Sequence, residues 1–403
     1  MYRRTLLVSL IALAATQAAC QQQTDQPLRI AVLKGTVPPQ LVSAFKETLQ
    51  DPVKLSVQAK PSMAELFHQL QQWQTADNPT RRQLPFNLFG SRPARMADWV
   101  SLSDYWLAPA IQQQLISPLP VDSIPQWSEL PEQWPSLLYR DRQGRLSDQG
   151  LLWATPYRWG YLAMVYSRRS FERLGWQPTE WQDIWHPDLA GRVSLLNHPR
   201  ITLGMVLKSH GYSANDAAPA THSDFKEALK ELPQQIVTYA SENYVQPLIQ
   251  GRTWLAVGWS TDIMPLLSRY RQLDMVIPAP GTLLSADLWV KPSQASPNDQ
   301  NALSEDEKIA PPKASFKAES LDSRWLAHWW QPDTEAPLSL FSNGLSPRLL
   351  MTEDSSATTT DLSTSRLLRP STAQLEQSEF LTPLSEESVE EYTRLWEELR
   401  RRE

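Results

Sequence analysis

The N-terminal part of the chain alternates strand-like and helix-like segments, and this alternation restricts the possible folds. Residues 28–33, LRIAVL, are typical of a buried strand, and residues 38–49 predict a helix that opens on two prolines. Residues 53–57 alternate as a strand does, and residues 63–74 have the spacing of an amphipathic helix. Strands separated by helices form parallel sheets that the helices cover. We therefore predict an α/β fold.

The next predicted strand, residues 97–103, ends at polar and aromatic residues. Ser103, Asp104 and Tyr105 stand where this strand ends and a helix begins. In open α/β sheets, ligands bind at the carboxyl ends of the strands. These three residues are therefore the first candidates for a binding site.

The second half of the chain continues the alternation. A helix follows residue 196: Asn197 can cap it, Pro199 fits its first turn and Gly211 can end it. The polar and Pro-rich residues 294–318 predict a flexible insertion, and the chain closes with a helix over residues 386–402. The further predicted strands cover 192–196, 252–260, 273–280 and 285–293.

Composition and motifs exclude several classes of function. The chain has 403 residues, enough for two ordinary domains, and its net charge of -6 argues against non-specific nucleic-acid binding. The sequence contains no GxSxG, phosphate-loop or GxGxxG pattern, and its six histidines lack metal-ligand spacing. We therefore expect no metal, no cofactor and no enzymatic activity. The 17 tryptophans suit either a core or a ligand cage, and we expect most of them to be core.

The first twenty residues resemble an export signal. A basic start at Arg3 and Arg4 precedes an apolar run that is too short to span a bilayer. Cys20, the one cysteine, follows small residues as in a bacterial lipoprotein signal, which predicts lipid attachment there; ordinary signal cleavage is the alternative. The arginine pair fits a twin-arginine signal or an ordinary basic start. We expect an extracytoplasmic protein that contacts the membrane surface through its lipid.

Six segments, in one order from about residue 28 to about residue 350, carry a resemblance to a known family. They are VPPQLVSAF, SLSDYWLAPAIQQQLISPL, TPYRWGYLAMVYSRR, WQDIWHPDLAGRVSLLNHPRITLGMVLKSHGYSAN, VTYASENYVQPLIQGRTWLAVGWSTDIM and VIPAPGTLLSADLWVKPS, followed by NGLSP. Together they resemble the spermidine/putrescine-binding periplasmic proteins of ABC transporters. The resemblance implies a type II-like periplasmic-binding-protein fold, in which two α/β lobes joined by crossing strands close on a ligand.

The resemblance also implies a division of the chain and a set of partners. Residues 1–20 are the export signal, residues 27–155 and 286–350 form the first lobe, and residues 156–285 and 351–403 form the second lobe. The expected protein is a monomer that binds a small amine and then docks on an ABC transporter permease. The transporter's ATPase supplies the energy for import, and this chain performs no covalent chemistry.

Several positions match the family's ligand contacts. Ser103 and Tyr105 match contacts of the first lobe, and Trp259 matches a tryptophan of the second lobe. Asp287 matches the family's central aspartate. In addition, Arg158 and Trp159 fall where the family's chain first crosses between the lobes, so the resemblance implies that they line or flank the cleft.

Other positions depart from the family pattern. The family has a Trp and a Tyr before the double proline, where this chain has Leu33 and Thr36 with Lys34 between them. His198 and Ile201 replace an Asp and a Glu that hold amines in the family. In the same way, Ser285 replaces a Trp and Pro280 replaces a Glu. Loss of one partner of a desolvated charge pair costs on the order of 2–5 kcal/mol, and about 1.4 kcal/mol is tenfold in affinity.

These departures favour a changed ligand. We expect a ligand that carries a carboxylate or is smaller than spermidine. Asp104 or Asp287 would hold its amine, and the helix entrance at residues 197–200, which includes His198, would hold its acid group with Arg200 or Lys34.

Two alternatives remain open. The chain could be a degenerate binding protein that acts as a sensor or a scaffold. It could also be a secreted hydrolase, for which Asp104 and Asp287 are the visible acid pair.

Overall fold

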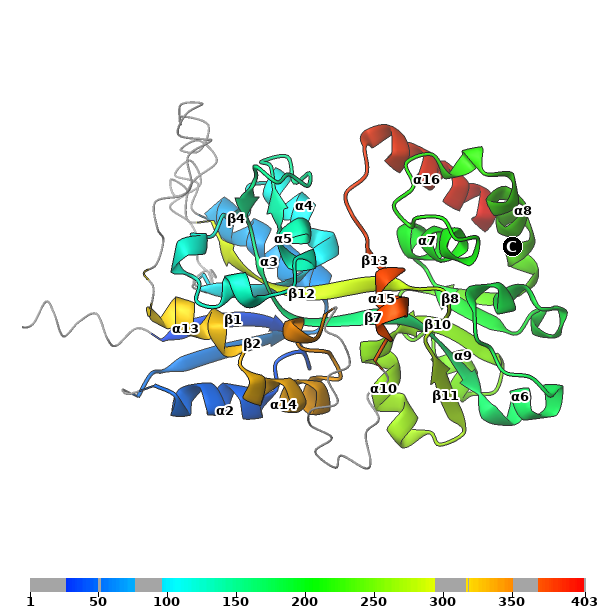
Figure 1. Cartoon of the computed structure of the whole chain (residues 1–403), viewed down its shortest axis with the longest axis horizontal. Helices are drawn as coiled ribbons and strands as arrows, with labels where there is room; N and C mark the ends of the chain where they lie inside the picture. The colour runs from blue at the N-terminus through cyan, green and yellow to red at the C-terminus, as the bar shows by residue number, and fades with distance from the viewer. Residues whose placement is uncertain are drawn as a thin grey trace, which may run out of the picture.

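The computed structural model describes residues 27–49, 52–76, 96–293, 317, 319–350 and 369–401. Figure 1 shows two lobes that lie side by side and are joined by the long strands β7 and β12. The predicted two-lobed α/β fold is therefore confirmed. Cys20 and residues 294–316 and 318 of the predicted insertion lie outside the described residues.

The first lobe is built on parallel strands, two of which are largely buried. Strand β1 pairs in parallel with β2 and with β3, in the order β2-β1-β3. The elements of this lobe are β1 (Leu28–Leu33), α2 (Pro39–Glu47), β2 (Leu55–Lys60), α3 (Met63–Ala76), β3 (Trp99–Ser103), α4 (Asp104–Gln112), β4 (Ile116–Ser117), α5 (Gln133–Leu138), β5 (Tyr139–Arg140), β6 (Leu151–Leu152), α13 (Leu321–His328) and α14 (Pro332–Ser342).

The second lobe continues the same path of strands in the order β7-β10-β8-β9, with β10, β8 and β9 parallel to each other. Helix α7 begins after His198, so the predicted cap at Asn197 is wrong by one residue; Gly211, with φ of 76°, follows the helix as predicted. The elements of this lobe are α6 (Arg168–Leu174), β8 (Val193–Leu196), α7 (Pro199–Ser209), α8 (Ser223–Glu231), β9 (Ile236–Ala240), α9 (Gln246–Ile249), β10 (Leu255–Trp259), α10 (Ser260–Arg269), β11 (Leu273–Val276) and α16 (Glu386–Arg400).

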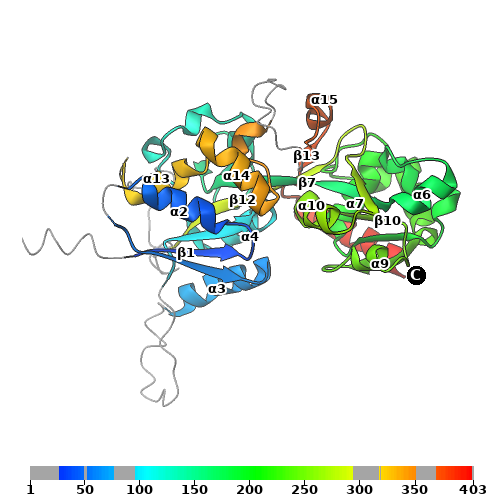
Figure 2. The same cartoon turned by 90° about the horizontal axis from the view of Figure 1, so that it is seen from below.

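Two long strands connect the lobes. Strand β7 (Thr155–Ser167) pairs with β12 (Leu283–Pro292) near its start and with β10 and β11 near its end. Strand β12 also pairs with β3 of the first lobe. Figure 2 shows β7 in the narrow region between the lobes.

The last described segment, residues 369–401, returns from this junction to the second lobe. Helix α15 (Thr372–Glu376) and strand β13 (Glu379–Phe380) lie at the junction, where β13 pairs in parallel with the start of β12 (Figure 1). Helix α16 then packs on α7 and buries Tyr392, Leu395 and Leu399. We refer to residues 379–401 as the C-terminal strap.

The core of the first lobe is rich in tryptophan. Trp289 of β12 stacks on Tyr157 of β7 with ring centroids 4.3 Å apart. Trp325 in helix α13 and Trp329, which follows that helix, also contact the ring of Trp289. All four side chains are fully buried, as expected for most tryptophans of the chain. Such rings bury large apolar areas and fix the position of β12 against β7.

No helix in the described part of the chain combines the length and the apolar composition needed to cross a membrane. Within the same residues, no group of three or more His, Cys, Asp and Glu side chains is placed to hold a metal ion.

Candidate ligand-binding site

Three strands bring predicted site residues together at the junction of the lobes. The pairing register sets Asp287 of β12 opposite Ser103 of β3 on one side and opposite Arg158 of β7 on the other. These residues are far apart in sequence, and only the crossing of β7 and β12 makes them neighbours. The carboxyl end of β3 therefore meets the connecting strands at the predicted site.

The central aspartate is already paired within the protein. Arg158 Nε lies 2.6 Å from Asp287 Oδ2, and Arg158 Nη1 donates a 2.6 Å hydrogen bond to the carbonyl of Ser342. The two side chains are only 8% and 13% exposed. Burial alone would lower the pKa of Arg158, but Asp287, through its charge and its hydrogen bond, together with Tyr157 and Asp262, raises that pKa. Asp287 is therefore neutralised by a buried guanidinium.

A glycine makes this ion pair possible. A Cβ atom on Gly344 would lie 2.2 Å from Cγ of Arg158 and 2.4 Å from its Cδ. Both distances are far below van der Waals contact, so any larger residue would push the arginine side chain away from Asp287. The NGLSP segment is therefore fitted to Arg158.

The two tryptophans of the prediction occupy different environments. Trp159 is 1% exposed, and its indole Nε1 donates a 2.8 Å hydrogen bond to the carbonyl of Ser346. Its ring thus packs inside the protein. Trp259 ends β10, is half-buried, and its backbone amide donates to the hydroxyl of Tyr244.

Lys34 lies apart from the charged cluster. It is exposed in the turn after β1, where its backbone amide donates a 2.8 Å hydrogen bond to the carbonyl of Lys60. Lys34 does not line the cavity described next.

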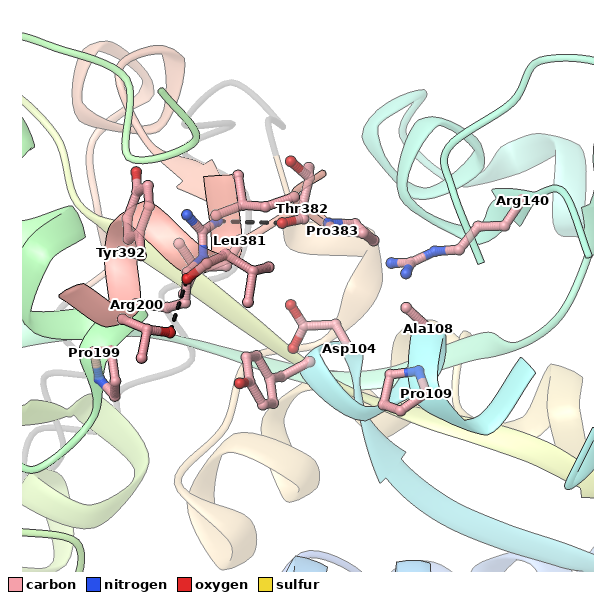
Figure 3. Close-up of a pocket in the computed structure, with 14 residues that line it drawn as sticks. Asp104, Ala108, Pro109, Arg140, Pro199, Arg200, Leu381, Thr382, Pro383 and Tyr392 are labelled. Atoms are coloured by element: carbon pink, nitrogen blue, oxygen red, sulfur yellow. Dashed lines mark hydrogen bonds between the residues drawn. The ribbon is translucent and has the colours of Figure 1, made fainter. Parts of the chain in front are cut away.

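A cavity of about 300 Å³ lies between the lobes. The first lobe contributes the start of α4 and Arg140, the second lobe contributes the start of α7, and the C-terminal strap closes another side (Figure 3). Of the predicted site residues, Asp104, Tyr105 and Arg200 line it. The remaining lining residues are Ala108, Pro109, Pro199, Leu381, Thr382, Pro383, Leu384, Val389, Tyr392 and Thr393.

Asp104 is held at the base of helix α4 by the connecting strand. Its Oδ1 accepts a 3.0 Å hydrogen bond from the Ala286 amide and a 3.1 Å hydrogen bond from the Ser285 hydroxyl. The side chain is 3% exposed, and burial raises the pKa of Asp104 to about 6. Ser285, which replaces a tryptophan of the family, thus serves to position this carboxylate.

Arg140 is a site residue that the sequence analysis missed. Arg140 is 1% exposed, and burial lowers its pKa to about 10. Nε donates to the carbonyl of Leu137 at 3.0 Å and Nη1 donates a long 3.4 Å bond to the carbonyl of Gly144, but Nη2 has no hydrogen-bond partner among the residues that the structure describes. The turn-forming sequence DRQG at 141–144 signals the hairpin that carries it, but nothing local shows that its start faces the cleft.

Arg200 makes its contacts within the protein. Its guanidinium donates to the carbonyl of Ala214 at 3.3 Å and to the side chain of Asn215 at 2.9 Å. It also donates to the carbonyl of Thr382 at 3.2 Å, the bond drawn in Figure 3. It also lies over the ring of Tyr392, 4.8 Å from its centroid. The C-terminal strap therefore uses donors that the sequence analysis assigned to a ligand.

His198 and Tyr105 connect the two lobes. Their rings meet edge to face, with centroids 4.8 Å apart, across the cleft between α7 and α4. Burial, and then the charge of Arg200, lower the pKa of His198 to about 4. The imidazole is therefore neutral at pH 7 and does not replace the family's carboxylate with a charge of either sign.

Two α/β lobes joined by crossing strands, with a charged cavity between them, define the class of two-lobed solute-binding proteins. The chain belongs to the family of bacterial extracellular solute-binding proteins, whose model matches residues 95–304. The resemblance to spermidine/putrescine-binding proteins is also confirmed. Proteins of this family bind solutes and are not enzymes, which favours the expectation of no catalysis.

Similar proteins from several bacteria carry names of this kind. The putrescine/cadaverine-binding protein of Pseudomonas aeruginosa is 26% identical over 153 residues, which cover 36% of this chain and 43% of the relative. Spermidine/putrescine-binding periplasmic protein 1 of Haemophilus influenzae is 24% identical over 198 residues, which cover 49% of this chain and 52% of the relative. The chain thus spans about half the length of the curated relatives it matches.

Solved structures match over nearly the whole chain. The spermidine/putrescine transporter substrate-binding protein of Streptococcus pneumoniae superposes with a TM-score of 0.70 at 17% identity, covering 94% of this chain and 99% of that one. A lipoprotein of Treponema pallidum superposes with a TM-score of 0.62 at 15% identity, covering 93% of this chain and 99% of that one. At these identities the likeness establishes the fold.

Proposed function

We propose that this chain is the extracytoplasmic substrate-binding component of an ABC importer. The observation that carries the proposal is the cavity whose walls come from both lobes, with Asp104 on one lobe and Arg200 on the other. A solute that contacts both walls stabilises the closed arrangement of the lobes, and closure of this kind commits a solute to delivery. Family membership and the names of similar proteins support the same function.

The ligand in this proposal is an amine that is smaller than spermidine or carries a carboxylate. Linear polyamines need a carboxylate for each terminal amine. Here Asp287 is paired with Arg158, and the positions of two amine-binding carboxylates hold His198 and Ile201. Among the described residues that line the cavity, Asp104 is the one carboxylate, which suits one amine rather than several.

The partners and the location form part of the same proposal. The closed protein docks on a permease of the transporter, and the protein works as a monomer at the outer surface of the membrane. Lipid attachment at Cys20 holds it there; replacement by Cys20→Ser would release the mature protein from the membrane fraction. If the Cys20→Ser protein stays in that fraction, the lipid anchor is refuted.

Ligand-induced closure is the direct test. Titration calorimetry with putrescine, spermidine, amino acids and small carboxylates would identify a ligand, and small-angle scattering would measure the radius of gyration with and without it. We expect one class of solute to bind and to reduce the radius of gyration. Absence of binding and closure across the panel would refute the proposal.

A second candidate, a degenerate binding protein that serves as a sensor or scaffold, has one observation in its favour. The Arg158–Asp287 ion pair fills the place of a ligand amine with a side chain of the protein itself. A protein of this kind would show no closure with any solute of the panel. A hydrolase is less favoured because Asp287, one of its two acids, is held as the partner of Arg158.

A further inference from the structure

Two opposite charges face the cavity between the lobes without pairing with each other. Asp104 and Arg140 both line this cavity, and in Figure 3 the guanidinium of Arg140 extends toward Asp104. No ion pair within 4 Å joins them among the described residues, although each charge acts on the pKa of the other. The space between them is therefore suited to a ligand that bridges both charges.

The Arg140 guanidinium needs an acceptor. The residue is 1% exposed and positively charged, yet within the described part of the chain its side chain donates only to two backbone carbonyls, and Nη2 has no partner there. Buried charges in proteins are normally paired and hydrogen-bonded, because an unsatisfied buried donor costs stability. An anionic group of a ligand would complete this site, and a carboxylate matches the fork of a guanidinium.

Asp104 has a free oxygen for a cation. Both hydrogen bonds that it accepts in the described structure, from Ala286 and Ser285, end on Oδ1. No hydrogen bond to its Oδ2 is found among the described residues, and Asp104 lines the cavity. An ammonium group there would regain the ion pairing that burial has denied to this carboxylate.

The two charges discriminate between classes of amine. An α-amino acid carries its ammonium and its carboxylate on one carbon, so it can contact neighbouring groups of opposite sign. A diamine would place one ammonium on Asp104 but would bring its positive charge close to Arg140. Like charges in a desolvated site disfavour the wrong ligand, which gives selectivity as effectively as new contacts do.

The rest of the cavity is small and mostly apolar, apart from Arg200, which is bonded within the protein, and the hydroxyl-bearing Thr382, Tyr392 and Thr393. The C-terminal strap contributes Leu381, Pro383, Leu384 and Val389, and α4 contributes Tyr105 on the opposite side. A volume of about 300 Å³ stands at the lower end of the usual range for ligand pockets. These walls suit an apolar side chain of modest size.

We propose that the ligand is a small α-amino acid with an apolar side chain, bound with its ammonium on Asp104 and its carboxylate on Arg140. The strap residues from Leu381 to Leu384 contact its side chain. This inference rests on the proposed solute-binding function and specifies the ligand class and its site. It also places the site beside, and not on, the Arg158–Asp287 pair.

Ligand analogues test the inference on the unaltered protein. Titration calorimetry would compare L-leucine with L-leucinamide, which lacks the carboxylate, and with 4-methylpentanoate, which lacks the amine. We expect L-leucine to bind at least tenfold more tightly than either analogue and than putrescine. Equal affinity for L-leucine and L-leucinamide would overturn the role of Arg140.

Variants of the two charged residues test the site. Asp104→Asn and Arg140→Gln should each weaken L-leucine binding at least thirtyfold. The exposed residues Asp148 and Arg145 provide the matched controls Asp148→Asn and Arg145→Gln, which should bind as the unaltered protein does. If Arg140→Gln does not fold, Arg140→Lys retains the charge but loses the fork, and it should weaken binding of L-leucine but not of L-leucinamide.

The outcomes separate this inference from the proposed function. Tight binding of putrescine or spermidine, unaffected by Arg140→Gln or by Arg140→Lys, would leave the solute-binding function in place and overturn the amino-acid site. Failure of every amine, amino acid and carboxylate to bind would overturn both. Binding of L-leucine that neither Asp104→Asn nor Arg140→Gln weakens would overturn the site but not the ligand class.

Discussion

Replacement of Asp104 by asparagine should make the unliganded protein more stable while it removes ligand binding. Asp104 is 3% exposed, and its charged form is disfavoured because burial outweighs the hydrogen bonds from Ala286 and Ser285. An asparagine keeps the oxygen that accepts those bonds and is neutral at every pH. A residue that costs stability at such a position is commonly retained for function.

The size of the effect follows from the pKa. Burial raises the pKa of Asp104 from 3.8 to about 6, and each pKa unit corresponds to about 1.36 kcal/mol. Asp104→Asn should therefore raise the free energy of unfolding by about 3 kcal/mol at pH 7, as an upper bound. The gain depends on pH in a defined way. Below the unfolded pKa the aspartate is protonated in both states, so the gain is absent; it grows between about pH 4 and pH 6 and is constant above.

Urea denaturation, followed by tryptophan fluorescence and by circular dichroism, would measure both proteins at about pH 4 and pH 7. Agreement of the two signals would justify a single unfolding free energy. A variant that is less stable than the unaltered protein at pH 7 would refute the reasoning, since it would show that Asp104 stabilises the fold. An equal gain at both pH values would refute the assignment of the gain to a desolvated charge.

Three further predictions concern the neighbouring contacts. Arg158→Leu should free Asp287 and raise the affinity for putrescine at least tenfold in calorimetry, at a stability cost of about 3–5 kcal/mol. Adding Asp287→Asn to this variant should abolish the gain in affinity. An unchanged affinity in Arg158→Leu would contradict the idea. Gly344→Ala should lower the melting temperature, corresponding to about 1–3 kcal/mol, because its Cβ would lie 2.2 Å from the Arg158 side chain; unchanged melting would count against that packing. Burial alone would raise the pKa of Glu379, but hydrogen bonds from Ser213 and Lys208 and the charge of Lys208 lower it. The Glu379 carboxylate therefore stabilises the fold above its unfolded pKa, and this contribution is lost as the pH falls through the folded pKa. Glu379→Gln should therefore melt earlier than the unaltered protein at pH 7 but equally at about pH 3, and a difference that persists in acid would contradict this.

Local sequence patterns were sufficient to predict much of the fold. The alternation of apolar residues placed β1, α2 and α3 close to their observed bounds, and the strand predicted over 97–103 is β3, Trp99–Ser103. Proline and glycine fixed the two ends of α7, with an error of one residue at its cap. These features depend on neighbours along the chain, which is why the sequence reveals them.

The charges of the site depend on contacts across the chain and were predicted less well. Arg158 and Asp287 are separated by 129 residues, and their pairing requires the crossing of β7 and β12 in one particular register. Each residue alone fits a ligand-binding role, and only their distance shows that they bind each other. In the same way, the helix of the C-terminal strap was predicted from its pattern, but its packing against Arg200 was not.

The balance of charge at the junction of the lobes also argues for an amino-acid ligand, which is a zwitterion with no net charge. The cations Arg140, Arg158, Arg200 and Lys208 are matched by four carboxylates. These are Asp104, which acts on Arg140, Asp287 and Asp262, which act on Arg158, and Glu379, which acts on Arg200 and pairs with Lys208. A dication would add two positive charges to this balanced set, in a region where interactions between charges are stronger than in water. An amino acid adds no net charge, and it supplies the acceptor that Arg140 Nη2 does not find among the described residues. The family's polyamine ligands therefore fit this arrangement only if carboxylates are freed, which is what Arg158→Leu would do.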